Sequence, residues 1–577
     1  MKLRKIILMA MAMTSVVAFA VPTQLHIKVV ETTDSHGNIF PYNFITRQAG
    51  KGGLSRVSTY VNSLRAQSGD DCVILLDGGD NLQGQPSAYY YNAIDTVSEH
   101  LLASAMNYMR YDAAVIGNHD IEAGHSVYDR LSRQFSFPLL GANVIRTKTG
   151  RPYFLPYTII KRQGVKIAII GITTPTIPQW VPQNLWEGMR FNDIQKTAEY
   201  WIRVLNDFDE KPDIVIGLFH SGLENKYKSP YYSPENASFD VASQVPGFDI
   251  IFMGHDHQRY KGYVDSSDGS RVLLLNPGYN IYSVAVADID LTIDNGKVTK
   301  NAILGEIVDL GGTAPDPNFN NRFAAQYQAV SDFVSRKVGT FDCDISTRDA
   351  YFGPSAFVDL LHQIQLDISG ADISFAAPLA FDATIKAGDI YVSDLFSLYR
   401  YENRLYVMEL SGKEIKDYLE YSYYLWTKQM YSAKDNLLWF KNEDPSTHNL
   451  QNLSYNFDTA AGIIYTVDVT KPKGEKINII SMANGKRFDP TRIYRVAVNS
   501  YRGNGGGGLL TDGAGIWRSM LKRRVVSSTE RDLRYYIMKR IEEMGTVSPK
   551  PLNQWKFIPE EIVGPAIERN RKDLFGS

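Results

Sequence analysis

The chain has 577 residues, more than one hydrophobic core normally organises, so we expect it to fold as two domains. Its 61 lysine and arginine residues are balanced by 63 aspartate and glutamate residues. This balance excludes a broad basic field for a nucleic-acid polymer, so an anionic ligand must be held by a local site such as a metal.

The first twenty residues have the three-part pattern of a secretory signal peptide. Lys2, Arg4 and Lys5 are followed by an apolar run from Ile6 to about Val17, and residues 18–20 have the small-x-small spacing of a cleavage site. The run is short for a membrane span of about 20 residues, and an uncleaved anchor is the alternative. We therefore expect residues 1–20 to be removed, leaving an exported protein without membrane attachment.

The chain contains two cysteines, Cys72 and Cys343. This number excludes a metal site built from cysteines. A bridge between them is possible in an oxidising compartment, but a buried free thiol at Cys72 is an equal alternative.

The first half of the chain repeats one pattern, in which a short apolar run ends in a polar cluster and a segment of helical spacing usually follows. Such runs suit strands that are buried on both faces of a sheet. The expected strands are 25–30, 73–76, 113–116, 167–170, 214–218, 250–253 and 272–275, with helical spacing at 53–65 and 97–109. The alternation predicts a layered α/β domain over residues 21–312.

Beyond this domain, glycines and prolines interrupt the chain at 311–317, and helical spacing follows at 319–338. We expect a linker helix within 313–344 and a second α/β domain over 345–577, with strands at 404–410, 463–469 and 494–498. Near the end, Ser527 and Glu530 have capping-box spacing, which predicts a helix over 531–544 that Gly545 stops.

Five strand ends in the first half carry side chains that bind metals. Loops at the carboxyl ends of the strands converge on one crevice in an α/β sheet, so these clusters should meet in space. Each cluster alone is a weak signal, and the second is also typical of a turn. The clusters are Asp34-Ser35-His36, Asp77-Gly78-Gly79-Asp80-Asn81, Gly117-Asn118-His119-Asp120, His220-Ser221-Gly222 and Gly254-His255-Asp256-His257.

In this order the clusters resemble the signature of the calcineurin-like metallophosphoesterases. The resemblance implies an N-terminal four-layer αββα domain that holds two divalent metal ions. It implies that one ion is held by Asp34, His36, Asp80 and His257. It implies that the other is held by Asp80, Asn118, His220 and His255, with Asp80 shared.

The side-chain types agree with phosphoester chemistry. Two divalent ions a few Å apart can clamp the attacking and leaving oxygens of an in-line displacement and activate a water. Imidazole, carboxylate and amide ligands suit Zn, Mn, Co or Fe, and the sequence leaves the identity open. Asp77, Asn38 and Asn276 are expected to support the ligands from behind or at the rim of the site.

His119 resembles the family's histidine that binds no metal. The resemblance implies that it protonates the leaving oxygen or stabilises charge on the phosphate. We expect Asp120 to orient it, as carboxylates orient imidazoles elsewhere. The alternative is that His119 is a plain ligand or a structural histidine.

Residues 345–577 resemble the C-terminal, nucleotide-binding domain of the 5′-nucleotidase superfamily, so the two resemblances cover most of the chain. Segments 398–405, 455–458 and 499–502 are similar to the branch of 2′,3′-cyclic-nucleotide 2′-phosphodiesterase/3′-nucleotidases. The 5′ branch typically places arginines just before the Ala-Gly-Asp-Ile segment at 387–390, whereas residues 376–382 contain none.

A nucleobase can be held between two aromatic faces, each contributing about 1–3 kcal/mol. Tyr455 or Phe457 is the candidate for one face and Tyr501 for the other, with a core position as the alternative for each. Arg502 is the candidate for phosphate or ribose, or else pairs with a carboxylate. The glycine run at 503–508 lacks the Gly-Lys-Ser/Thr of a phosphate-binding loop, which favours a turn or a close approach of backbone to ligand.

The resemblance implies an exported, periplasmic, monomeric hydrolase with a small-molecule nucleotide substrate. It would open 2′,3′-cyclic nucleotides to 3′-nucleotides and dephosphorylate 3′-nucleotides to nucleosides, with hinge motion between the domains. The alternatives are a 5′-nucleotidase or UDP-sugar hydrolase, the sulfur-transferring relative of the superfamily, and a non-catalytic nucleotide-binding surface protein.

Overall fold

The computed structural model describes residues 22–207, 211–224, 233–442 and 449–576. The predicted signal peptide, residues 1–20, lies outside the described residues. Among the described residues, no helix combines the length and the apolar character needed to cross a membrane.

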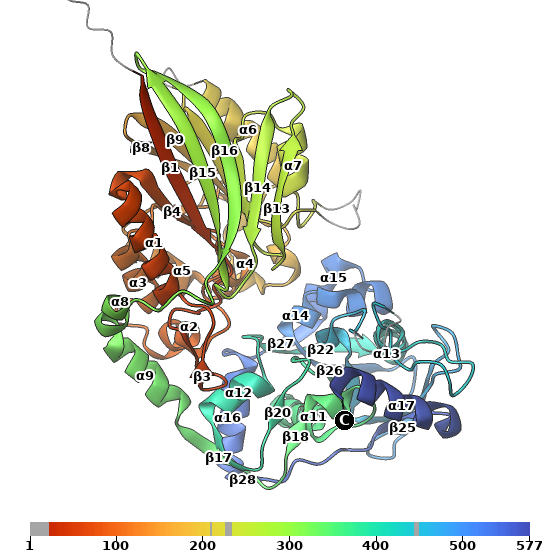
Figure 1. Cartoon of the computed structure of the whole chain (residues 1–577). Coiled ribbons are helices and arrows are strands. Elements are labelled where there is room, and N and C mark those ends of the chain that lie inside the picture. Colours follow the sequence, from red (N-terminus) through yellow and green to blue (C-terminus); the bar gives the residue numbers. More distant parts are fainter. Residues whose placement is uncertain (1–21, 208–210, 225–232, 443–448, 577) are drawn as a thin grey trace, which may run out of the picture.

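Two six-stranded sheets form the centre of the first domain (Figure 1), with strand orders β16-β15-β1-β4-β5-β6 and β13-β14-β12-β11-β9-β8. Every strand predicted in the first half of the chain is present. The strands are β1 (Thr23–Thr32), β4 (Val73–Asp77), β5 (Ala113–Val115), β6 (Leu139–Leu140), β8 (Tyr157–Arg162), β9 (Val165–Thr173), β11 (Ile214–His220), β12 (Ile250–Met253), β13 (Arg259–Asp265), β14 (Arg271–Pro277), β15 (Ser283–Asp294) and β16 (Lys297–Asp309).

The continuous apolar runs are explained by two cores on opposite faces of each sheet. In β1, Ile27 and Val29 pack between the two sheets, whereas Val30 packs on the outer face. In β4, Leu76 faces the inner core and Leu75 the outer one. Because side chains alternate along a strand, both faces of each run are buried.

Helices cover the outer face of each sheet, which completes the predicted α-β-β-α order of layers (Figure 1). The helices on the first sheet are α1 (Leu54–Ser68), α3 (Leu101–Met109) and α5 (His125–Gln134). Those on the second sheet are α6 (Ile194–Asn206) and α7 (Ser238–Gln244).

The linker contains two helices where the sequence predicts one. The side chain of Asp316 caps α8 (Pro317–Arg322), and α9 (Ala324–Val334) follows. Phe323 between them has φ −106° and ψ 19°, and its ring packs 4.8 Å from that of Phe319 in the outer core of the first domain. The second helix ends at Val334, and the chain is already extended in β17 (Lys337–Phe341). The helix predicted over 319–338 is therefore too long at its C-terminal end.

The second domain contains a five-stranded sheet in the order β23-β19-β26-β22-β27 and two three-stranded sheets, β21-β17-β28 and β25-β24-β29. Its strands are β19 (Ile373–Ala376), β21 (Gly388–Tyr391), β22 (Leu405–Ser411), β23 (Thr459–Ala461), β24 (Ile463–Asp468), β25 (Ile477–Met482), β26 (Ile493–Asn499), β27 (Val525–Ser528), β28 (Thr546–Val547) and β29 (Trp555–Ile558). Its longer helices are α11 (Ala356–Ser369), α12 (Val392–Leu398), α13 (Gly412–Trp426), α16 (Leu533–Met544) and α17 (Glu560–Phe575).

The predicted capping box before α16 is wrong. Ser527 lies in β27, which pairs with β22 and keeps the chain extended through Ser528. The side chain of Asp532 caps the helix instead, accepting a hydrogen bond from the N–H of Tyr535 at 3.1 Å. Gly545 ends the helix at φ 67°, as predicted.

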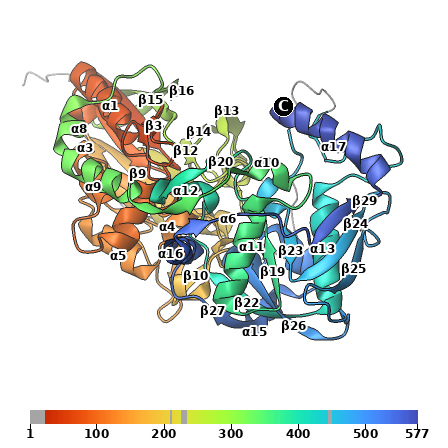
Figure 2. The same ribbon diagram turned by 90° about the horizontal axis from the view of Figure 1, so that it is seen from below.

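The two domains meet along α2 (Pro86–Tyr89), where α12 and α16 lie at the joint in Figure 2. The ring of Tyr89 packs 5.6 Å from that of Phe396, and its hydroxyl donates to Asp532 at 3.1 Å. Arg47 also donates from the first domain to the hydroxyl of Ser393 at 2.6 Å. Cys72 and Cys343 are both free thiols, which excludes a bridge between them in this structure.

Candidate metal centre and nucleotide site

Asp34, His36 and His257 form a first cluster at the ends of β1 and β12. The Nε2 atom of His257 lies 3.3 Å from Oδ1 of Asp34 and 3.0 Å from Nε2 of His36. One ligand atom from each residue lies within 4.8 Å of the others. The three side chains therefore face a common point.

Asp80, His220 and His255 form a second cluster with the same 4.8 Å spacing. The Nε2 atom of His220 lies 3.1 Å from Oδ2 of Asp80 and 3.1 Å from the amide oxygen of Asn118. Asp80 and His255 follow β4 and β12, His220 is the last residue of β11, and Asn118 starts α4 (Asn118–Glu122). The structure thus brings all the predicted ligands together in two clusters, and the sharing of Asp80 between two ions stays a prediction.

The donor atoms of the clusters fit divalent cations. Oδ1 of Asp34 is buried, and no donor in the described part of the chain gives it a hydrogen bond. The Nδ1 atoms of His36 and His220 lie 3.0 and 2.7 Å from the carbonyl oxygens of Gln83 and Gly78, to which they donate. Each imidazole therefore directs Nε2 into its cluster, which is the arrangement of a metal-binding histidine when Nε2 carries no proton.

The electrostatics of the clusters also favour a positive charge. Burial opposes ionisation of Asp34 and Asp80, yet the neighbouring imidazoles hold the pKa of each carboxyl below its usual range. Burial also disfavours the charged form of His220, but the Asp80 carboxylate raises the pKa of His220 to about 10. The second cluster therefore stabilises added positive charge, as a metal ion would supply. In the first cluster, burial lowers the pKa of His36 to about 4, which keeps its imidazole neutral at neutral pH, the form that binds a metal.

The backbone of the ligands is strained in a way that points to function. Left-handed conformations are uncommon for residues other than glycine and cost about 1–3 kcal/mol each, so they cluster at functional sites. The candidate ligands with positive φ are Asp34 (48°), His36 (46°), Asp80 (58°), His255 (77°) and His257 (58°).

Glycines next to the ligands allow the loops to approach closely. A Cβ atom on Gly117 would lie 2.2 Å from Oδ1 of Asp80, and one on Gly254 would lie 2.7 Å from Oδ2 of Asp34. The glycines of the Gly-Asn-His and Gly-His-x-His motifs are therefore required by contact with the ligand carboxylates.

His119 lies beside the metal clusters, with its ring centroid 5.6 Å from that of His36. Its Nδ1 atom lies 2.7 Å from Oε2 of Glu122. The prediction that Asp120 orients His119 is wrong, because adjacent helical residues point in different directions whereas positions i and i+3 share a face. Burial lowers the pKa of His119, but Asp80 and Glu122 outweigh it and raise the pKa to about 9.

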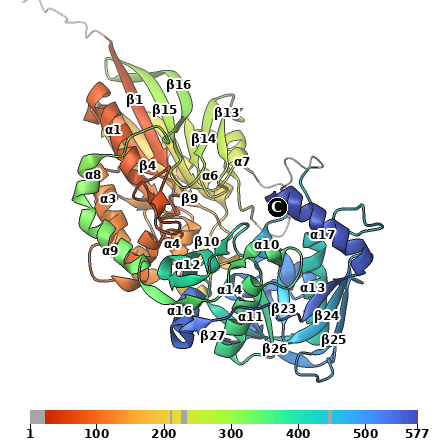
Figure 3. The ribbon, with the colours of Figure 1, turned by 60° about the horizontal axis from the view of Figure 1, so that its bottom comes forward.

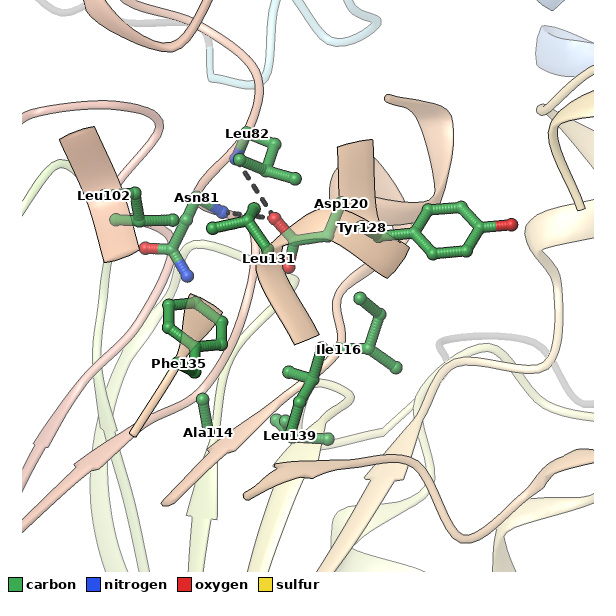
Figure 4. Close-up of a pocket in the computed structure, with 11 residues that line it drawn as sticks. Asn81, Leu82, Leu102, Ala114, Ile116, Asp120, Tyr128, Leu131, Phe135 and Leu139 are labelled. Atoms are coloured by element: carbon green, nitrogen blue, oxygen red, sulfur yellow. Dashed lines mark hydrogen bonds between the residues drawn. The ribbon is translucent and has the colours of Figure 1, made fainter. Parts of the chain in front are cut away.

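Asp120 supports the loop after β4 instead. Its carboxylate accepts hydrogen bonds from the backbone N–H groups of Asp80 at 2.9 Å, Asn81 at 2.8 Å and Leu82 at 3.0 Å. Figure 4 shows the Asp120 carboxylate pointing toward Asn81 and Leu82, next to a small apolar crevice. Asp120 therefore fixes the position of the ligand Asp80.

The three residues expected to support the ligands all brace the ligand loops. Asp77 accepts from Asn81 Nδ2 at 2.6 Å, beside the ligand Asp80. The side chain of Asn276 donates to Oδ1 of Asp256 at 2.9 Å, within the turn that carries His255 and His257. The side chain of Asn38 donates to the carbonyl of Ser35 at 2.8 Å, in the loop between Asp34 and His36.

Two aromatic residues near the ligands were missed by the sequence analysis. The indole of Trp180 stacks on the imidazole of His255 at 5.7 Å and 27°, and the ring of Tyr279 stacks on His257 at 4.9 Å and 15°. Neither lies in a motif, and no signal in the sequence marks them. They limit the rotation of two imidazoles.

The prediction that Phe457 stacks on the base is wrong. Its ring is 1% exposed and stacks on Trp426 at 5.4 Å and 2°, in the core of the second domain. It follows the short helix 454–456, which turns its side chain inward.

The prediction that Arg502 contacts substrate is also wrong. Its guanidinium is buried and pairs with the carboxylate of Asp458 at 2.9 Å. It also donates to Asn456 Oδ1 at 3.0 Å and to the carbonyls of Tyr455 at 2.7 Å and Gly506 at 2.8 Å. Arg502 therefore ties the loop at 455–458 to the glycine run, with its donors committed to the protein.

Tyr455 and Tyr501 lie together, but at 6.3 Å and 88° they are perpendicular and do not form two parallel faces. Tyr401, which the sequence analysis quoted only within a segment, lies 6.3 Å from Tyr455 at 81°. Tyr455 therefore stands edge-on to two rings on which a base could stack.

A hollow of about 300 Å³ adjoins this aromatic group and is lined by Arg400, Tyr401 and Tyr455. This size is within the range of small-molecule sites. Phe381, which is 41% exposed, lines the same hollow and comes from the segment that lacks arginine.

The aromatic group faces the first domain. Burial is the largest cause of the raised pKa of Tyr401, and Glu122 from α4 adds to it. Burial likewise raises the pKa of Tyr501, with a contribution from Glu235 of the first domain. Figure 3 shows α14 (Ser500–Gly503), which carries Tyr501, on the side of the second domain that meets the first.

Two family models match the chain. Residues 27–259 match the model described as calcineurin-like phosphoesterase, and residues 337–512 match the model described as 5′-nucleotidase, C-terminal domain.

The chain is also similar to curated proteins and solved structures. It is 28% identical to the trifunctional nucleotide phosphoesterase protein YfkN of Bacillus subtilis, covering 93% of this chain but 39% of that protein. It is 28% identical to a 2′,3′-cyclic-nucleotide 2′-phosphodiesterase/3′-nucleotidase of Yersinia enterocolitica, covering 95% of this chain and 90% of that protein. A solved structure from Staphylococcus aureus matches with a TM-score of 0.75 and 21% identity, covering 92% and 99% of the two chains, which shows the shared fold.

Proposed function

This chain belongs to the calcineurin-like phosphoesterases that carry a 5′-nucleotidase C-terminal domain, and on that premise we propose that it opens 2′,3′-cyclic nucleotides to 3′-nucleotides and converts these to nucleosides. The observation that carries the proposal is the placement of two metal-type clusters opposite an aromatic group of the second domain. The two clusters can hold the phosphate, and the aromatic group can hold the base.

The ligands Asp34, His36, Asn118, His220, His255 and His257 and the carboxylate of Asp80 would hold two divalent ions. When bound, such ions supply Lewis acidity that stabilises charge on a phosphoryl group and activates water. Around them, the stacked rings of Trp180 and Tyr279 and the hydrogen bonds of Asp120 hold the protein groups in place.

His119 is placed to act as the general acid. Glu122 fixes the ring through Nδ1, and although burial lowers the pKa of His119, the carboxylates of Asp80 and Glu122 raise it, which favours the protonated form that a general acid needs. In the opening of the cyclic phosphate, the oxygen of a water forms a new bond to phosphorus as the bond between phosphorus and O2′ breaks, and Nε2 of His119 gives its proton to O2′. The proton that the water loses restores the imidazolium. In the second reaction another water bonds to phosphorus, His119 gives its proton to O3′, and the phosphate is released.

The segment at 376–382 supports the 3′ branch over the 5′ branch. It lines the hollow with Phe381, at the place in the sequence where 5′-nucleotidases typically carry arginine. The signal-like pattern of residues 1–20 supports the further proposal that the enzyme acts outside the cytoplasm, in the periplasm.

The substrate proposal is tested with 2′,3′-cyclic AMP, 3′-AMP and 5′-AMP, each measured with Mn²⁺ and with a chelator. We expect metal-dependent hydrolysis of the first two, with kcat/KM at least about tenfold above that for 5′-AMP, a ratio equivalent to about 1.4 kcal/mol. Dominant hydrolysis of 5′-AMP would assign the chain to the 5′ branch. Binding of all three without turnover would identify a nucleotide-binding protein instead.

Tyr501→Ala should raise KM for 3′-AMP by about 5- to 150-fold, because about 1–3 kcal/mol of base stacking is lost. Tyr501→Phe keeps the aromatic face and should keep KM close to that of the unmodified enzyme. Phe457→Ala is the matched control, since its ring packs against Trp426 in the core and its loss should lower the unfolding temperature. An unchanged KM in Tyr501→Ala would remove Tyr501 from the base site.

A further inference from the structure

Glu235 contacts the second metal cluster from outside. Its Oε1 atom lies 2.8 Å from Nε2 of His255, and its side chain is 40% exposed. Glu235 lies in the segment between β11 and α7, outside every motif that the sequence analysis identified.

The contact determines which nitrogen of His255 can bind a metal. An ionised carboxylate only accepts hydrogen bonds, so at 2.8 Å the Nε2 atom of His255 is the donor. The other nitrogen, Nδ1, is then bare in the neutral imidazole and available to the cluster of Asp80 and His220. His255 is thereby set as an Nδ1 ligand, whereas His36 and His220 offer Nε2.

The other contacts of His255 leave this choice open. Its backbone N–H donates to Oδ2 of Asp34 at 3.0 Å, which fixes the main chain. The indole of Trp180 stacks on the ring at 5.7 Å, which fixes the plane of the imidazole. Neither contact distinguishes the ring from the same ring flipped by half a turn. Among the described residues, the hydrogen bond to Glu235 is the one that does.

Glu235 is itself held in place by its neighbours. The side chain of Asn236 accepts from the N–H of Gly222 at 2.7 Å, and the N–H of Ala237 donates to the hydroxyl of Ser221 at 3.1 Å. These contacts attach the segment to the turn that directly follows His220. The carboxylate therefore moves together with the second cluster.

We propose that Glu235 is a positioning residue that holds His255 as an Nδ1 ligand and thereby sets the metal affinity of the second cluster. In the part of the chain that the structure describes, the side-chain contact of Glu235 is to His255 and not to Asp34, His36 or His257, so we expect the first cluster to keep its affinity without it. This inference rests on the proposed function of a two-metal phosphoesterase. Carboxylate partners of metal-binding histidines contribute about 10- to 100-fold to affinity.

The test is a calorimetric titration of the metal-free, full-length protein with Mn²⁺, which measures the affinity of each metal site. Glu235→Ala should weaken one of two sites by about 10- to 100-fold and leave the other unchanged. Glu235→Gln should restore most of the affinity, because its amide oxygen still accepts from Nε2 of His255. Glu224→Ala is the matched control, since Glu224 is an exposed carboxylate close in sequence.

If Glu235→Ala bound Mn²⁺ at both sites with the affinities of the unmodified protein, the proposal would be overturned. An equal loss at both sites together with a lower unfolding temperature would also overturn it, since that pattern belongs to a structural role. The titration contains no nucleotide, so it gives a result even if the enzyme fails to hydrolyse the three test nucleotides. A failure of the substrate proposal is therefore distinguishable from a failure of this one.

Discussion

His119→Ala is expected to lower kcat for 2′,3′-cyclic AMP by about 10²- to 10⁴-fold, the usual contribution of a general acid. The substitution removes the proton donor next to the phosphate site but none of the groups in the two metal clusters. Both ions should therefore remain bound, which elemental analysis of the purified variant measures directly. A kcat equal to that of the unmodified enzyme would exclude His119 as the acid.

The partner of His119 gives a control within the same helix. Glu122→Ala should lower kcat without loss of metal, and the double variant with His119→Ala should be no slower than His119→Ala alone, because both act through one imidazole. Asp120→Ala should instead weaken metal binding, since Asp120 fixes the loop that carries Asp80. The reverse pattern, with Asp120→Ala behaving like His119→Ala, would contradict the assignment of Glu122.

Arg502→Ala is expected to lower the free energy of unfolding by about 3–5 kcal/mol, because it leaves the carboxylate of Asp458 buried without its partner. Denaturant unfolding followed through the fluorescence of the second domain measures this loss. Replacing both residues, as in Arg502→Met with Asp458→Leu, should recover part of it, since an apolar pair is often as stable as a buried ion pair.

The same variant separates a structural from a substrate-binding role for Arg502. A raised KM for 3′-AMP with an unchanged free energy of unfolding would place Arg502 in the substrate site. A large loss of stability is the result that the buried contacts of its guanidinium predict.

The layered fold and the convergence of the candidate metal ligands could be predicted because both depend on short-range patterns. Each buried strand is a continuous apolar run, and the candidate ligands lie at or just beyond the ends of such runs, as His220 ends β11 and Asp80 comes three residues after β4. Parallel strands in a sheet end at the same edge, so the order of the clusters was sufficient to bring them together.

The predictions that were wrong depend on the direction of individual side chains. Asp120 and Glu122 are both acidic neighbours of His119, and the turn of α4 decides which one reaches it. Phe457 and Tyr455 are two residues apart, and the short helix at 454–456 buries one and leaves the other partly exposed. Glu235 and Trp180 reach His255 from distant loops, a form of contact that no local pattern encodes.

The central claim is that one site opens the cyclic phosphate on its 2′ side and then removes the 3′-phosphate. The most direct measurement is a time course of the products from 2′,3′-cyclic AMP with Mn²⁺ present, separated by chromatography. The predicted result is a transient rise of 3′-AMP followed by adenosine and phosphate, with neither formed in the presence of chelator. Formation of 2′-AMP, or no turnover of the cyclic nucleotide while 5′-AMP is hydrolysed, would contradict the claim.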